Sequence, residues 1–372
     1  MNLADYLKEV PLLDHHCHFL IDGTLANRAQ RTAMVSSEAD SSYYPLEDTK
    51  NRLAWWEFQA EAKKFSQDFD PLNVLTQQQY QQYCTNLFGH YDYRSLLIDI
   101  GFVPDNAILD LKETATLTNT SVYPIYRLET AAQDIMQKSA TFEQWWQALY
   151  AEVKMAKANG YVGFKSIAAY RFGLKITEVS EKQAKIAFEA WKKSSVVRLS
   201  DPQIISYLVW NLAPLMIKQD LPLQFHVGYG DADTDMYQGN PLLLRDFLQK
   251  WCLAGLKVVL LHCYPYHREA GYLASVFPNL YFDISLINPL GPSAIERVLD
   301  EALELAPYTR FLFASDASTS PEMYGVAARR FKDALLAHFE KLTLLPLDAK
   351  KRYIDAICWQ TSAQIYGIRE EF

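Results

Sequence analysis

Short apolar runs recur along the chain at intervals that leave room for a helix between one run and the next. Two examples are "KVVLLHC" and "RFLFASD", and amphipathic stretches such as "FEQWWQALYAEVKMAKAN" separate the runs. Near-continuous apolar strands that alternate with helices predict a parallel sheet buried on both faces. The runs begin at Leu12, Leu96, Ser121, Tyr161, Pro222, Lys257, Leu280 and Arg310.

Eight strand and helix units in succession predict an α/β fold, a (β/α)8 TIM barrel that forms a single domain over residues 1–372. An open, doubly wound sheet is the alternative arrangement of the same units. Such a sheet usually carries a Gly-x-Gly-x-x-Gly motif after an early strand, and this sequence has none. The barrel is therefore favoured.

One segment interrupts the alternation between the first and second predicted strands. Residues 22–94 are aromatic and helical in pattern, as in "NRLAWWEFQAEAKKFSQDF". A connection of about seventy residues is far longer than a strand and helix unit requires. We interpret 22–94 as a helical insertion that caps the barrel mouth. A helical extension on the side of the barrel, serving as a dimer contact, is the alternative.

Composition narrows the classes of partner. Among 372 residues, 36 Lys and Arg stand against 44 Asp and Glu, so the formal net charge is −8. A mild acidic excess argues against a nucleic-acid partner. The five cysteines are scattered without a Cys-x-x-Cys pair, which predicts reduced thiols in the cytoplasm. The start "MNLADYLKEV" lacks a signal-peptide pattern, and the apolar runs are too short for a bilayer, so we expect no membrane association.

Titratable side chains stand at the same end of several predicted strands. In "DHHCHF", His16 and His18 are two positions apart, so their side chains share one face, while His15 and Cys17 point away. Two imidazoles on one face can hold a single cation. The groups at the ends of later strands are Lys165, His226, His262 and Asp316.

In a barrel these strand ends converge on one mouth, where the active sites of this fold lie. Each residue alone has an ordinary explanation. A strand-end histidine is often a hydrogen-bonded polar group, and Asp316 could cap the next helix. Lys165 could be an ion-paired amine, but a lysine in an apolar strand is costly to bury unless it is neutralised. Together, the six groups in strand register indicate a metal site.

This order of residues resembles the amidohydrolase superfamily of metal-dependent barrel enzymes. The closer resemblance is to amidohydrolase-related domains (amidohydrolase 2) of the nodulin and FluG type. The helical insertion matches this pattern only loosely. The stretches that carry the resemblance are residues 163–174, 224–233, 261–285 and 311–318.

The resemblance implies ligands for one or two divalent ions. The ligands implied for the more buried ion are His16, His18 and Asp316, and those for a second ion are His226 and His262. Lys165 would bridge the two ions if its amine is carboxylated. If Lys165 stays an amine, one ion is expected on His16, His18, His226 and Asp316, and His262 then becomes a hydrogen-bond donor. Zinc suits imidazole ligands best, and manganese suits the oxygen ligands.

The resemblance also implies a hydrolase. A metal-activated water would attack a C–N or C–O bond of a small, carboxylate-bearing substrate. Asp316 is the expected proton acceptor and donor, and His262 the expected group that polarises the substrate carbonyl in the one-ion version. A metal-dependent decarboxylase or other lyase is the alternative. A non-catalytic barrel that keeps the metal for structure, or binds a partner through its helical insertion, is a third possibility. The full ligand set and the lack of suitably placed cysteines disfavour it.

Three residues are predicted to contact the substrate. Arg171 follows the fourth strand and could clamp a carboxylate with two parallel hydrogen bonds; an ion pair that braces its loop is the alternative. Tyr170 and Tyr229 are candidate pocket walls, with core packing as the ordinary explanation. A small-molecule substrate is the expected partner, and homo-oligomerisation is left open.

Overall fold

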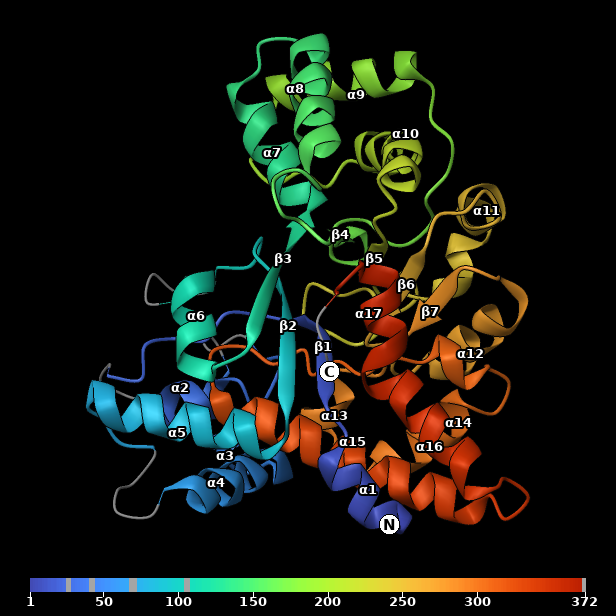
Figure 1. Ribbon diagram of the computed structural model, residues 1–372. Coiled ribbons are helices and arrows are strands. Elements are labelled where there is room, and N and C mark those ends of the chain that lie inside the picture. Colours follow the sequence, from blue (N-terminus) through green and yellow to red (C-terminus); the bar gives the residue numbers. More distant parts are fainter. Residues whose placement is uncertain (25–27, 40–43, 67–71, 104–107, 370–372) are drawn as a thin grey trace.

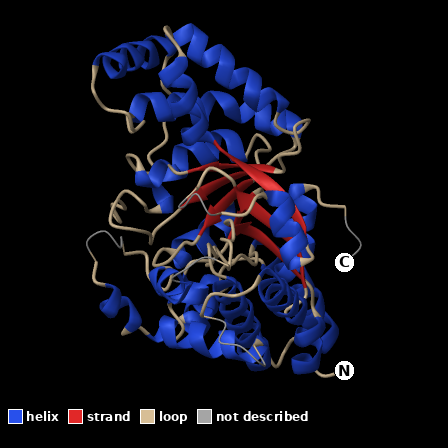
Figure 2. Ribbon diagram, turned by 90° about the vertical axis from the view of Figure 1, so that its left-hand side faces the viewer, coloured by secondary structure: helices blue, strands red, loops and turns tan. Residues whose placement is uncertain are grey.

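The computed structural model describes residues 1–24, 28–39, 44–66, 72–103 and 108–369. A parallel sheet forms its centre, with helices outside it (Figures 1 and 2). The strands neighbour one another in the order in which they occur along the chain. They are β1 (Leu12–Cys17), β2 (Tyr93–Asp99), β3 (Ser121–Arg127), β4 (Gly163–Ser166), β5 (Leu223–His226), β6 (Val258–Leu261) and β7 (Leu280–Phe282).

An eighth extended segment, residues 311–317, closes the sheet between β7 and β1. Its Leu312 amide donates to β7 at 3.0 Å, and three backbone hydrogen bonds of 2.8 to 3.4 Å join it to residues 15–18. The amide of Phe313 donates instead to Ile357, in a helical turn, so the ladder is interrupted and no regular strand forms here. The predicted α/β barrel is therefore confirmed, and the open sheet is excluded because both edges are joined.

A small apolar cluster fills the inside of the barrel below its mouth. Alternate side chains of a strand point inward, and in narrow barrels they pack against one another. The last helix, α17 (Thr361–Tyr366), contributes Ile365 and Tyr366 to this cluster and so closes the floor. The strand residues of the cluster are Leu13, Leu97, Ile125, Val259, Leu261, Tyr281 and Leu312.

Helices surround the barrel and bury their apolar faces on it. The helices between β2 and β5 are α6 (Leu111–Thr118), α7 (Leu128–Lys138), α8 (Phe142–Met155), α9 (Glu181–Lys193) and α10 (Pro202–Gln219). Helices α7 to α10 contact one another and gather at one end of the molecule (Figure 1). The remaining ones outside the insertion are α1 (Leu3–Glu9), α11 (Arg245–Phe247), α12 (His267–Val276), α13 (Ile287–Leu290), α14 (Ile295–Ala302), α15 (Pro321–Lys341) and α16 (Leu347–Asp355). Within the described ranges, no helix combines the length and the apolar character that crossing a membrane requires.

Short helical turns connect several of these elements, and side-chain caps mark where some helices begin. At the start of α5 (Gln77–His90), the Thr76 hydroxyl accepts from the Gln79 amide while the Gln79 side chain accepts from the Thr76 amide. This reciprocal pair satisfies two amides that no helical carbonyl can reach, and α6 and α9 begin in the same way. The short turns are η1 (Ala168–Tyr170), η2 (Pro241–Leu244), η3 (Leu248–Cys252), η4 (Tyr308–Arg310) and η5 (Ala356–Gln360).

The predicted insertion, residues 22–94, contains four helices in its described parts, and its last two residues belong to β2. Its helices are α2 (Arg28–Met34), α3 (Leu46–Lys50), α4 (Leu53–Phe65) and α5. Helices α4 and α5 pack against α15, where Nε of Arg329 lies 3.0 Å from Oε2 of Glu61. A different part of the insertion lines the cavity at the barrel mouth through Glu38. That the whole insertion acts as a cap stays a prediction.

Candidate metal centre

The six predicted ligands lie at one rim of the barrel. His16 is in β1 and His18 follows it, Lys165 is in β4, and His226 is the last residue of β5. His262 follows β6, and Asp316 belongs to the eighth segment. Because the carboxyl ends of parallel strands share one rim, residues far apart in the sequence meet here, and all six line one cavity.

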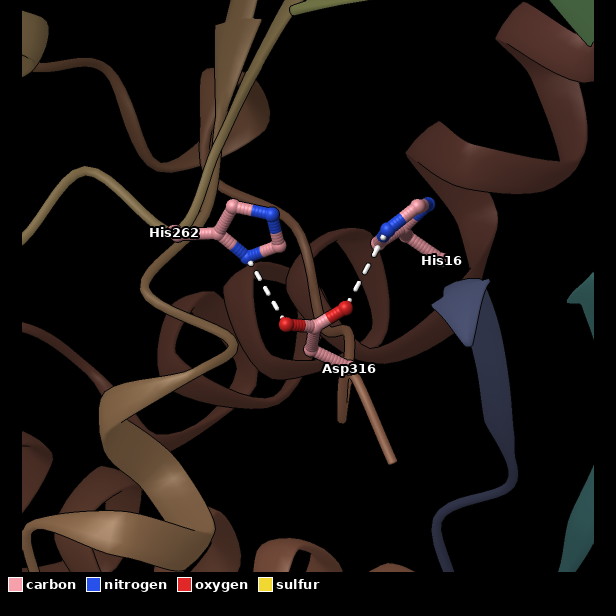
Figure 3. Close-up of side chains that lie close together, drawn as sticks. All are labelled: His16, His262 and Asp316. Atoms are coloured by element: carbon pink, nitrogen blue, oxygen red, sulfur yellow. Dashed lines mark ion pairs between the residues drawn. The ribbon is translucent and has the colours of Figure 1, made fainter. Parts of the chain in front are cut away.

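The carboxylate of Asp316 lies at the centre of this group. Its Oδ1 atom is 3.2 Å from Nε2 of both His16 and His18, and its Oδ2 atom is 3.3 Å from Nδ1 of His262. Figure 3 shows the two oxygens facing His16 and His262 from opposite sides. Three imidazoles from two strands therefore converge on one carboxylate.

His262 and Asp316 both have left-handed backbone conformations. Their φ angles are 70° and 52°, values that residues other than glycine rarely adopt. Hydrogen bonds hold both positions: the His262 amide donates to Oδ1 of Asp283 at 2.7 Å, and the Asp316 amide donates to the His16 carbonyl at 3.0 Å. Such conformations persist only where the surrounding structure maintains them, and they are found most often at functional sites.

Burial makes the imidazoles suitable ligands. It lowers the pKa of His16, His226 and His262 well below the ordinary histidine value, and the nearby Lys165 lowers each of them further. These rings are therefore neutral at physiological pH, and a neutral imidazole is the form that binds metal ions.

His226 provides a direct test of whether these residues fit a metal ion. Its ring is packed between those of Tyr170 and His262, with centroid separations of 4.2 and 4.4 Å. Nε2 of His226 and Nδ1 of His18 are buried and have no hydrogen-bond partner among the described residues. A buried polar atom without a partner is costly, and a bound cation would remove that cost. The donor set of imidazoles and a carboxylate therefore fits a divalent metal ion.

Lys165 is buried among these groups, with no counter-ion among the described residues. Its Nζ atom lies 3.4 Å from Nε2 of His16, and in the described part of the chain no carboxylate oxygen is within 4.0 Å of it. Burial lowers the pKa of Lys165 to about 8, against the opposing attraction of Asp99 and Asp316. A partly deprotonated amine is the form that reacts with carbon dioxide, so the expected carboxylation is chemically feasible here.

Asp99 is a further candidate ligand that the sequence reasoning missed. It ends β2, and its oxygen lies within 4.8 Å of ligand nitrogens of His16 and His18. The Arg127 guanidinium binds it at 2.5 Å. Burial alone would raise the pKa of Asp99, but Arg127, together with His18 and Lys165, outweighs burial and holds the pKa below its ordinary value. The run "LLIDIGF" places this aspartate at a strand end, the same signal that identified the other six.

The cavity above the ligands has a volume of about 230 Å³, and cationic side chains form part of its wall. Arg127 is paired with Asp99, and Arg198 is paired with Asp233 at 2.5 Å. Of the predicted substrate contacts, Arg171 and Tyr170 line the cavity. Tyr229 is not among the lining residues, and its hydroxyl lies beside Arg52 and the backbone of Glu38.

Arg171 differs from the other two arginines because it has no carboxylate partner among the described residues. Its side chain makes a weak hydrogen bond of 3.4 Å to Oε1 of Gln133, and its Nε atom is buried without a partner in the described structure. Burial lowers the pKa of Arg171, and the neighbouring Arg198 lowers it further. The ion pair expected as the alternative role of Arg171 is therefore absent among the described residues.

Glu38 is a second lining residue that the sequence reasoning missed. It belongs to the insertion and lines the cavity together with Asp316 and Asp231. Burial raises the pKa of Glu38 to about 8, and repulsion from Asp316 and Asp231 adds to the effect. No periodic signal marks a lone glutamate in a loop, so only the folded arrangement shows that it faces the ligands.

Comparisons with known proteins agree with this geometry. The chain is 60% identical to a protein from Lactobacillus casei ATCC 334 described as a metal-dependent hydrolase, over 98% of this chain and 97% of that one, with a TM-score of 0.96. Two uronate-type isomerases are similar in fold alone: uronate isomerase from Thermotoga maritima (14% identity, TM-score 0.68, covering 98% and 96% of the chains) and glucuronate isomerase from Caulobacter crescentus (14%, 0.69, covering 99% and 94%).

The chain spans less than half the length of one curated relative. It is 26% identical to the protein fluG of Emericella nidulans over 90% of this chain, and it spans 42% of that protein's length. The profile of the amidohydrolase family matches residues 146–368, which contain β4 to β7, the eighth segment and four of the six candidate ligands. The chain belongs to the amidohydrolase family.

Proposed function

We propose that the protein is a metal-dependent hydrolase that cleaves a C–N or C–O bond of a small substrate bearing a carboxylate. One observation carries the proposal: the Asp316 carboxylate is surrounded by three imidazoles beside a cavity whose wall holds Arg171, which has no ion-pair partner among the described residues. The resemblance to a protein described as a metal-dependent hydrolase supports it.

The metal would be held by the rim described above, with His16, His18, His226 and Asp316 as the central ligands. Zinc is the proposed ion because imidazole nitrogens predominate, and manganese is the second choice. When bound, a divalent ion supplies an electrophilic centre that acidifies water and polarises a carbonyl group. A carboxylated Lys165 would add two oxygen ligands and, with His262, complete a place for a second ion.

Asp316 moves the proton in the proposed reaction. It accepts the proton that the attacking water loses and delivers it to the leaving nitrogen or oxygen. The Asp316 backbone amide, which donates to the His16 carbonyl at 3.0 Å, keeps this residue in position before the substrate binds. With a single ion, His262 donates a hydrogen bond to the oxygen on which negative charge develops.

Arg171 binds the substrate carboxylate in this proposal. Its guanidinium lies at the cavity, and no carboxylate in the described ranges competes for it. A guanidinium matches a carboxylate with two parallel hydrogen bonds. Tyr170 packs on His226 and lines the same space, and Tyr229 braces the Glu38 side of the mouth. A volume of about 230 Å³ limits the substrate to a small molecule.

The test uses protein stripped of metal with a chelator and reloaded with Zn²⁺ or Mn²⁺. Both forms are screened against N-acyl amino acids, lactones and aromatic acids in H₂¹⁸O. We expect reloaded protein to release an acid that contains ¹⁸O, and stripped protein to be inactive. A metal-bound protein that releases carbon dioxide without incorporating ¹⁸O would overturn the hydrolase and favour the lyase. If the protein binds neither Zn²⁺ nor Mn²⁺, both the proposed hydrolase and the alternative lyase are refuted.

A further inference from the structure

A buried polar network lies beneath the candidate metal ligands, and Gln224 is at its centre. The Gln224 side chain, in β5, is completely buried. Its Oε1 atom lies 3.1 Å from Nδ1 of His16, and its Nε2 atom lies 2.8 Å from both the His15 carbonyl and the Tyr366 hydroxyl. One amide thus joins β1 to the helix α17 that closes the barrel floor.

The chemistry of these partners determines how the Gln224 amide is oriented. A backbone carbonyl can only accept a hydrogen bond, so the group facing the His15 carbonyl must be the amide NH₂. The amide oxygen must then face Nδ1 of His16, and an oxygen can only accept. Nδ1 of His16 therefore carries the ring proton. Nε2, the nitrogen that faces Asp316 in Figure 3, keeps its lone pair.

The network continues from Tyr366 to the opposite side of the site. Because the Tyr366 hydroxyl accepts from Gln224, its own proton is free to bind Nδ1 of His15, 3.2 Å away. Nε2 of His15 then bears a proton and faces Oδ2 of Asp283 at 3.0 Å, a close contact whose angles fall short of a hydrogen bond. Oδ1 of Asp283 accepts from the His262 amide, where the backbone is left-handed. One chain of buried groups thus connects the His16 ring to the backbone of His262.

We propose that Gln224 and Tyr366 are positioning residues that hold His16 in the Nδ1–H tautomer, so that the last helix of the barrel forms part of the metal site. Without the Gln224 oxygen, the His16 ring can instead carry its proton on Nε2. Oδ1 of Asp316, 3.2 Å from Nε2 of His16, would accept a proton from that nitrogen and block it as a ligand. The proposal depends on the metal site of the proposed function, but not on the reaction that the site catalyses.

The first test reads the tautomer directly in metal-free protein. Protein labelled with ¹⁵N-histidine gives two-bond correlations that distinguish Nδ1–H from Nε2–H, and the His16 signal is identified by its loss in His16→Asn. We expect Nδ1–H in the wild type and in Gln224→Glu, which keeps an accepting oxygen, and Nε2–H in Gln224→Leu. An Nε2–H signal in the wild type, or an unchanged Nδ1–H signal in Gln224→Leu, would overturn the proposal.

The second test measures the Zn²⁺ dissociation constant by competition with a chromophoric chelator. Gln224→Leu should raise the dissociation constant about 10- to 100-fold, the usual effect of losing a group that orients a ligand. Tyr366→Phe, which removes only the hydroxyl, should raise it about two- to ten-fold.

The matched control is Tyr93→Phe. The Tyr93 hydroxyl is also buried and donates to the Tyr324 carbonyl at 2.9 Å, away from Gln224. Tyr93→Phe should change the Zn²⁺ dissociation constant by less than about two-fold, and it should lower the melting temperature about as much as Tyr366→Phe does. Equal losses of Zn²⁺ affinity in the two tyrosine variants would reduce the role of Tyr366 to general stability. Metal binding that follows this pattern without any hydrolysis would refute the proposed function and leave this inference intact.

Discussion

The two sides of the cavity are built differently. The ligand side is formed by strand ends, and its groups lie within 3.2 to 3.4 Å of one another in a buried network. The opposite side is formed by loops and the insertion, where Arg171 and Glu38 have no ion-pair partner among the described residues. Strand-borne groups are thus positioned before any ligand arrives, whereas in the proposed function the loop-borne Arg171 gains its partner from the substrate. The ligand side should control turnover and the loop side substrate affinity.

The largest effect is expected on the ligand side, from Asp316→Asn. The amide is nearly the same size but cannot accept the proton, so kcat should fall about 10²- to 10⁴-fold. Metal analysis of the purified variant checks that most of the ion is retained. If kcat is close to that of the wild type with metal in place, Asp316 does not transfer the proton.

On the loop side, Arg171→Leu should raise KM about 10- to 100-fold for a carboxylate substrate and leave kcat nearly unchanged, because a charge-assisted contact is lost in the ground state and transition state alike. Arg198→Leu is the matched control. Arg198 is about half exposed and already paired with Asp233, so its removal should matter much less. Steady-state kinetics on both variants separate the cases, and similar KM changes would show that Arg171 is not the specific clamp.

The smallest effect is expected at Glu38. Its pKa of about 8 means that the carboxyl is mostly neutral at pH 7 and ionises as the pH rises past 8. An ionised Glu38 repels a substrate carboxylate, so KM should increase about three- to ten-fold between pH 7 and 9. In Glu38→Gln this part of the pH profile should disappear. If KM still rises with pH in Glu38→Gln, another group, such as Lys165, causes the pH dependence.

The same contrast explains what could be predicted from the sequence. Alternation of apolar runs with helical patterns located all eight barrel positions, because burial on both faces leaves a strong compositional signal. The positions of His16, His18 and Asp316 at strand ends then predicted that they meet at one rim, and this prediction did not require the conformation of the loops. The eighth run did not form a regular strand, because the Phe313 amide bonds to a helical turn, and such a tertiary contact leaves no trace in composition.

The residues that the sequence reasoning missed were overlooked for different physical reasons. Asp99 follows the strand-end rule, but its run reads as an apolar strand with an ordinary polar end. Glu38 and the pairing state of Arg171 depend on how loops fold over the mouth, and loop conformation has no periodicity to read. The relay through Gln224 depends on inward orientations inside the barrel, which need the closed sheet before they can be recognised.

The closure of the barrel by its eighth segment has a consequence for how the chain acquires its structure. Asp14 accepts hydrogen bonds from Ser315, a residue 301 positions further along the chain. While the polypeptide emerges from the ribosome, β1 therefore has an open edge that no neighbour covers until nearly all later strands exist. Contacts so distant in sequence form slowly, and uncovered strand edges invite association with other chains. Nascent copies of this protein are expected to depend on chaperones until residues 311–317 dock.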